Sequence, residues 1–187
     1  MSDPDKRRVF ATLMAGWLIL LLGAASLLLP LVAQGHATLL IGSLLLLAGL
    51  VELGAATRRH SARVPALLAG LITVLAGLLL LLGPTTAFIP TLYLIAGWLG
   101  CRAVLLIAAT AASHGSSIRR WTGIAAAIDT ALALLLLAGL SIATFVVALF
   151  GPTPDLIASF AWVLAASFAA TGLMLLEVAA CEREGAR

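Results

Sequence analysis

Six long apolar runs, separated by short polar clusters, account for almost the whole chain. They lie at about residues 9–30, 37–56, 64–83, 87–111, 122–150 and 156–180. A helix of about 20 apolar residues crosses the hydrocarbon core of a bilayer, so each run predicts one transmembrane helix. The fifth run is longer than one span needs, and its helix is therefore either strongly tilted or broken near Gly139, with the remainder at the membrane interface.

A pattern of glycine and proline recurs in these runs. Two glycines and a proline follow one another at seven-residue intervals in the first run and again in the third: Gly16, Gly23, Pro30 and Gly70, Gly77, Pro84. Seven residues make about two helical turns, so the three positions form one stripe on a helix face, and the proline marks the helix end. The recurrence predicts three helical hairpins, at about residues 9–57, 64–112 and 121–180, within a single membrane domain over 1–187.

The glycines also predict how the helices pack. In lipid, helices associate closely where small residues let their backbones approach. We therefore assign six glycines with the seven-residue spacing to helix packing: Gly16, Gly23, Gly42, Gly49, Gly70 and Gly77. Gly97 and Gly100 add small residues to the fourth run, whereas in the fifth run only Gly123 remains of the pattern.

Composition places the chain in a membrane. It has 187 residues, of which 63% are hydrophobic and 10% charged, and its mean hydropathy is +1.17. A soluble domain has about 25% charged residues, so a water-soluble fold is excluded. The predicted class is an all-α integral membrane protein whose immediate partner is the lipid bilayer. The net charge of +3 does not indicate nucleic-acid binding, because the basic residues form short clusters between apolar runs.

The basic clusters predict the topology. With six spans, every lysine and arginine outside the spans falls on one side: Lys6, Arg7, Arg8, Arg58, Arg59, Arg63, Arg119, Arg120, Arg183 and Arg187. Basic loops stay in the cytoplasm, so both termini of this multi-pass membrane protein are expected there.

The basic start before the first run also fits a secretory signal peptide. However, the apolar run is longer than a signal core, no Ala-x-Ala site follows it, and its glycine pattern recurs at Gly70–Pro84. We therefore assign the first run to the mature fold.

Three hairpins whose first helix carries Gly-x6-Gly-x6-Pro resemble the HdeD family of bacterial inner-membrane proteins. Trp121 and Asp129, in Trp-Thr-Gly-Ile-Ala-Ala-Ala-Ile-Asp, are similar to the start of the fifth helix in that family. The resemblance implies a role in tolerating acid or other envelope stress and brings no catalytic residues with it. The long run to Phe150 and the Gly-Pro-Thr-Pro turn after it depart from the compact third hairpin of the family.

Three ionisable residues fall inside predicted spans: Glu52, Arg102 and Asp129. A charged side chain at the centre of a span raises the free energy of membrane insertion by about 2.5–3.5 kcal/mol, so each of these residues is expected to have a structural or functional role. Glu52 shares the face of Gly49, and Asp129 shares a face with alanines, so both are expected to point into the bundle. Arg102 has bulky neighbours and is expected to extend toward the headgroups.

These residues leave two functional hypotheses. One is a non-enzymatic stress protein in which the charges form a structural ion pair or stay neutral. The other is a small transporter or proton-conducting bundle that uses Glu52, Arg102 and Asp129. Partners other than lipid would be a second copy of the chain or other envelope proteins.

No other chemistry is predicted. His36, His60 and His114 are single loop histidines without ligand spacing, so no metal site is expected. Cys101 and Cys181 have no CxxC partner and are expected to be reduced. No pattern indicates a catalytic set or a cofactor site, and we expect no enzyme activity.

Overall fold

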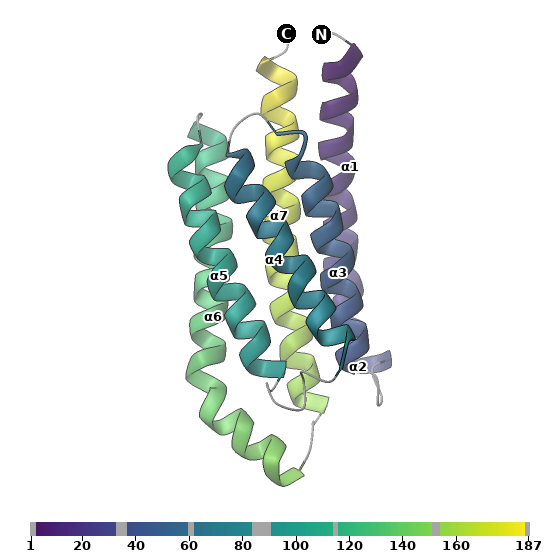
Figure 1. Ribbon diagram of the computed structural model, residues 1–187, viewed down its shortest axis with the longest axis vertical. Helices are drawn as coiled ribbons and strands as arrows, with labels where there is room; N and C mark the ends of the chain where they lie inside the picture. The colour runs from purple at the N-terminus through teal and green to yellow at the C-terminus, as the bar shows by residue number, and fades with distance from the viewer. Residues whose placement is uncertain are drawn as a thin grey trace.

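The protein is a bundle of long helices (Figure 1). The computed structural model describes residues 3–32, 37–59, 62–83, 91–113, 116–150 and 154–185. The helices in this part of the chain are α1 (Asp3–Ser26), α2 (Leu29–Val32), α3 (Ala37–Ala56), α4 (Arg63–Leu81), α5 (Thr91–Ala112), α6 (Ser116–Phe150) and α7 (Pro154–Gly185). All except α2 contain a stretch long and apolar enough to cross a membrane. The predicted all-helical fold with six such spans is therefore confirmed.

The end of α1 differs from the prediction. The helix ends at Ser26, and after a turn the chain enters the short α2, whose second residue is Pro30. The Ser26 hydroxyl donates to the carbonyl of Gly23 at 2.7 Å and lies 3.2 Å from that of Ala161 on α7. Pro30 therefore lies in the first turn of a new helix, where its missing N–H costs little. Pro84, Pro90 and the turn at 151–153 lie outside the described residues.

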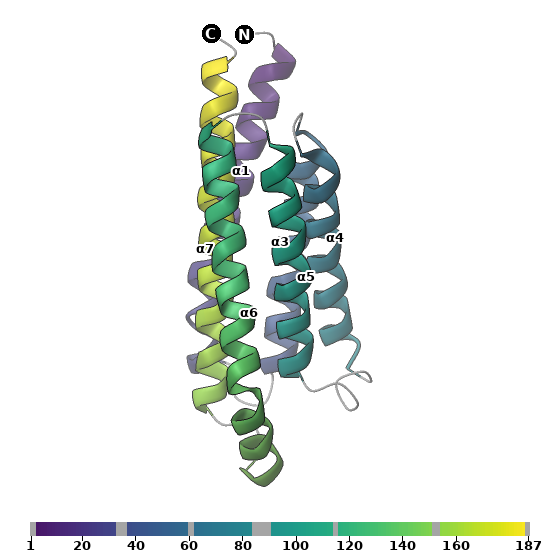
Figure 2. The same ribbon diagram turned by 90° about the vertical axis from the view of Figure 1, so that its left-hand side faces the viewer.

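The long fifth run forms one continuous helix. α6 extends without interruption from Ser116 to Phe150, so of the two alternatives, one tilted helix or a break near Gly139, the break is absent. Its first part, residues 117–138, is the stretch suited to crossing a membrane. Beyond it the ribbon bends inward beneath the ends of the neighbouring helices and extends past the end of the bundle (Figures 1 and 2).

Three pairs of helices pack most extensively: α3 with α4, α1 with α7, and α5 with α6. The first and last long helices therefore lie side by side and close the bundle, as both views show. These three pairs each join helices from two different predicted hairpins, the first and the third in the case of α1 and α7, rather than the two helices of one hairpin. The division into three hairpins remains a prediction from the sequence.

The start of α1, the end of α7 and the ends of α3 and α5 lie at one end of the bundle (Figure 1). Described basic residues gather there, and we call this region the basic end: Lys6, Arg7, Arg8, Arg58, Arg59, Arg63, Arg119, Arg120 and Arg183. The shared location matches the clustering on which the topology prediction rests.

Glycines lie at the closest contacts between α3 and α4. A Cβ at Gly77 would lie 2.5 Å from the backbone nitrogen of Leu46 and 2.8 Å from the carbonyl oxygen of Gly42. A Cβ at Gly49 would lie 3.0 Å from the carbonyl oxygen of Gly70. Backbone atoms cannot yield as a flexible side chain does, so only glycine allows these helices to approach so closely.

The α1–α7 pair follows the same arrangement. A Cβ at Gly16 would lie 3.1 Å from the carbonyl oxygen of Gly172, and one at Gly23 would lie 3.2 Å from Cβ of Phe168. By contrast, a Cβ at Gly97 or Gly100 would meet no packed neighbour within 4 Å. The packing role expected of these two glycines is therefore wrong within this chain, because they face away from the core.

Candidate functional site

The three ionisable residues of the predicted spans meet inside the bundle. Glu52 comes from α3, Arg102 from α5 and Asp129 from α6, and Ser167 and Thr171 of α7 complete what we call the Arg102 cluster. The arginine is 1% exposed, so the expectation that it extends toward the headgroups is wrong. Its hydrogen-bond partners on two neighbouring helices hold it in the interior.

Arg102 is the centre of this cluster. Its Nη2 donates to Oε1 of Glu52 at 2.7 Å and also to the hydroxyl of Thr171. Its Nη1 donates to the hydroxyl of Ser167 at 2.9 Å and lies 3.7 Å from Oδ2 of Asp129. One side chain of α5 therefore contacts polar groups of α3, α6 and α7. Its Nε has no hydrogen-bond partner.

The hydrogen bond to the Asp129 carboxylate comes from the hydroxyl of Ser167. The Ser167 hydroxyl donates a hydrogen bond to Oδ1 of Asp129 at 2.7 Å and accepts one from Nη1 of Arg102. Oδ2 of Asp129 is buried, has no hydrogen-bond partner and faces the guanidinium only at ion-pair distance. A buried carboxylate oxygen without a hydrogen bond is costly, and a proton on it would reduce that cost.

An aromatic ring supports the guanidinium from the same helix. Cζ of Arg102 lies 5.7 Å from the centre of the Trp98 ring, a cation–π distance. The indole Nε1 donates to the hydroxyl of Thr73 on α4 at 3.1 Å, and this hydroxyl donates to the carbonyl of Ala69. The chain of contacts fixes the Trp98 ring and ties α4 to the Arg102 cluster.

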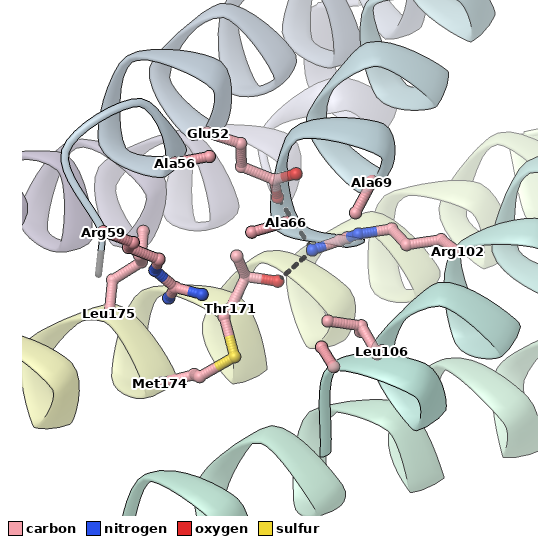
Figure 3. A pocket seen from close by; sticks show the side chains of 11 residues that line it. Glu52, Ala56, Arg59, Ala66, Ala69, Arg102, Leu106, Thr171, Met174 and Leu175 are labelled. Atoms are coloured by element: carbon pink, nitrogen blue, oxygen red, sulfur yellow. Dashed lines mark hydrogen bonds and ion pairs between the residues drawn. The ribbon is translucent and has the colours of Figure 1, made fainter. Parts of the chain in front are cut away.

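A small pocket connects the cluster with the basic end (Figure 3). Its volume is about 20 Å³, enough for about one water molecule. Glu52, Arg102 and Thr171 line it together with Arg59 from the linker after α3. Figure 3 shows the guanidinium of Arg59 and that of Arg102 directed into the same space.

Arg59 lies over this pocket and is 9% exposed. Its Nε and Nη2 are buried without a hydrogen-bond partner. Burial lowers the pKa of Arg59, while the carboxylates of Glu52 and Glu182 act in the opposite direction. An arginine nevertheless remains charged in a protein. If all are ionised, the two carboxylates and one guanidinium of the cluster carry one net negative charge, and Arg59 offsets it.

This arrangement can do two things chemically. Polar contacts across four helices fix their register, as buried polar groups do in other bundles. The carboxylates of Glu52, which lines the pocket, and Asp129, which is connected to it through Ser167 and Arg102, could also accept and release protons. Among the described residues, no group of three His, Cys, Asp or Glu side chains could hold a metal ion. His36, His60 and His114 lie outside that part of the chain.

Sequence reasoning missed the neutral members of the site. Ser167 and Thr171 are four residues apart in an apolar helix, so they lie on one helix face, and this spacing was the available signal. Trp98, four residues before Arg102, is one of the bulky neighbours of the arginine in the sequence, and its spacing alone does not indicate a contact with the guanidinium. Arg59 was counted as one of several solvated linker charges, and its burial depends on the packing of α3, α4 and α7 around it.

The comparisons with known proteins agree with a membrane bundle. The sequence profile of a short repeat of unknown function, DUF308, matches residues 14–82 and again residues 68–138. The two overlapping matches cover residues 14–138, more than half of the chain. No curated protein and no solved structure matches the sequence. The chain therefore belongs to the DUF308 short-repeat family, to which HdeD also belongs.

Proposed function

We propose that this protein is a non-enzymatic, multi-pass protein of the bacterial inner membrane that contributes to resistance against acid or other envelope stress, as its resemblance to HdeD implies. Both termini then lie in the cytoplasm. The clustering of basic residues at the end that holds both chain termini supports this orientation.

The Arg102 cluster is the observation that supports a structural rather than catalytic use of the charges. Arg102 is paired with Glu52 at 2.7 Å and bonded to two hydroxyl groups of α7. The pocket beside it holds about 20 Å³, whereas sites for small molecules measure about 300–1,000 Å³. A bound solute has no room there, and the cluster acts as a brace between helices.

An acid-challenge experiment tests this function. Cells that lack the chromosomal gene receive wild type or Arg102→Met, and survival at low pH is measured beside the amount of folded protein in the membrane. Wild type restores survival, and Arg102→Met restores it only in proportion to its remaining amount. Unchanged survival in the deletion strain would contradict the stress role. Loss of survival at full protein level would contradict a purely structural cluster.

A second candidate function is proton conduction through the cluster. Two observations favour it: Oδ2 of Asp129 has no hydrogen-bond partner, and the pocket brings the basic end within reach of Glu52. Because Arg102 stays protonated, protons would pass between Glu52 and Asp129 through water or the Ser167 hydroxyl, and would need a further path to the opposite end of the bundle.

Proton flux into proteoliposomes separates the two candidates. Wild type and Asp129→Asn are reconstituted at equal density with acid outside, and empty liposomes serve as the baseline. Flux in wild type that disappears in a folded Asp129→Asn variant would make the carboxylates a proton pathway. Flux at the baseline in both proteins would remove this candidate and leave the structural one.

A further inference from the structure

A groove on the outer face of α5 and α6 is not explained by the Arg102 cluster. The two helices run side by side (Figure 2), and the groove between them has a volume of about 620 Å³. It is lined by Ile107, Thr110, Ala111, Arg119, Gly123, Ala126, Ala127, Thr130, Ala131 and Leu134. The volume falls within the range of about 300–1,000 Å³ typical of ligand sites.

The lining suits a hydrocarbon chain. Small side chains form most of its floor, while Ile107 and Leu134 are 55% and 62% exposed at its sides. The hydroxyl protons of Thr110 and Thr130 are donated to carbonyls of their own helices, at 2.8 and 2.7 Å. The groove therefore offers no free hydroxyl donor from these residues, and an acyl chain can cover it without burying an unpaired one.

One end of the groove is charged. Arg119 lines it in the first turn of α6, at the basic end, and is exposed. From Arg119 to Leu134 the helix rises about 22 Å, at about 1.5 Å per residue. One leaflet contributes about 15 Å of hydrocarbon, half of the total thickness of about 30 Å. The groove thus covers the depth of an acyl chain in one leaflet and continues to the level of its headgroup.

From this match of length, lining and charge, we infer that the α5–α6 groove binds a phospholipid with an anionic headgroup. One acyl chain lies along Ala111, Gly123, Ala127 and Ala131, and the headgroup phosphate pairs with Arg119. Basic sites between helices at the cytoplasmic side bind anionic lipid headgroups by this complementarity. The inference does not depend on the proposed function, because no residue of the Arg102 cluster lines the groove.

Native mass spectrometry of the purified protein tests the site. Phosphatidylglycerol and phosphatidylcholine with the same acyl chains are added, and the lipid that remains bound is measured. Arg119→Gln should lower the affinity for phosphatidylglycerol about fivefold, equivalent to about 1 kcal/mol for one arginine near an anionic surface. Arg120→Gln is the matched control, since this exposed neighbour does not line the groove, and it should change the affinity less than twofold.

A second pair of variants tests the acyl part of the site. Ala127→Phe fills the groove and should remove most bound lipid of both kinds, whereas Ala108→Phe, exposed on α5 outside the lining, should leave binding unchanged. Circular dichroism checks that each variant folds, and Ala127→Leu replaces a variant that does not. Equal losses in Arg119→Gln and Arg120→Gln, or unchanged binding in Ala127→Phe, would overturn the inference. A dimer that dissociates in Ala127→Phe would overturn it as well and would assign the groove to a second copy.

Discussion

Arg102→Met is the substitution that tests the Arg102 cluster most directly. It keeps the length and volume of the side chain near those of arginine but removes its charge and its donors. Glu52 loses its 2.7 Å ion pair, the hydroxyls of Ser167 and Thr171 lose a donor, and Asp129 loses the guanidinium that lies 3.7 Å from it. Both carboxyl groups stay buried, at 7% and 1% exposure.

The expected cost follows from this uncompensated burial. Removing one partner of a buried ion pair destabilises a protein by about 3–5 kcal/mol, because the other charge stays out of water. The free energy of unfolding is measured for wild type and variant by denaturant titration in mixed micelles, followed by circular dichroism. The matched control is Val104→Met on the same helix. Its side chain is 65% exposed, so this change should cost less than about 0.5 kcal/mol.

A combined variant tests whether unpaired buried charge causes the stability loss expected in Arg102→Met. Arg102→Met together with Glu52→Gln and Asp129→Asn removes every charge of the cluster, and uncharged replacements of a buried ion pair are often neutral. We expect it to recover more than half of the stability lost in Arg102→Met alone. A loss below about 1 kcal/mol in the single variant, or no recovery in the combined one, would refute the view that an unpaired buried charge dominates the energetics.

Three further predictions use the same unfolding measurement. Gly77→Ala should cost about 1–3 kcal/mol, because its Cβ would meet backbone atoms of α3, whereas Gly97→Ala should change little; equal effects would contradict the close packing. Trp98→Phe should cost about 1 kcal/mol through the lost hydrogen bond to Thr73, and no change would mean that this bond contributes nothing. Ser167→Ala should cost about 1–3 kcal/mol, because it removes the hydrogen bonds that the hydroxyl makes with Nη1 of Arg102 and Oδ1 of Asp129, both buried; a neutral result would show that water replaces the hydroxyl.

The apolar runs determined the class of fold and the number of spans. A run of about 20 apolar residues has no stable place in water and must satisfy its backbone within a helix in lipid, so length and hydropathy suffice. The second run matches α3 over residues 37–56. Helix ends were less certain, as the early end of α1 at Ser26 shows, because a single hydroxyl contact with α7 contributes to where the helix stops.

The helix face on which Glu52 lies could also be predicted from the sequence. A three-residue spacing places Gly49 and Glu52 on one helix face, and this face is buried. The residues around Arg102 in its own helix could not predict whether its side chain points into the bundle or toward the lipid, because bulky neighbours surround an arginine in both positions. The guanidinium stays inside because it donates hydrogen bonds to Glu52 of α3 and to Ser167 and Thr171 of α7, and these contacts form only in the tertiary structure.

The sequence by itself determined that this chain is a helical membrane protein with ionisable residues in its spans, because these properties depend on local hydropathy and spacing. The tertiary structure alone decided which helices pair and which polar groups meet. α1 pairs with α7, although about 130 residues separate them along the chain. The burial of Arg59 and the groove between α5 and α6 likewise result from how separate helices approach, a property that no single helix carries in its own periodicity.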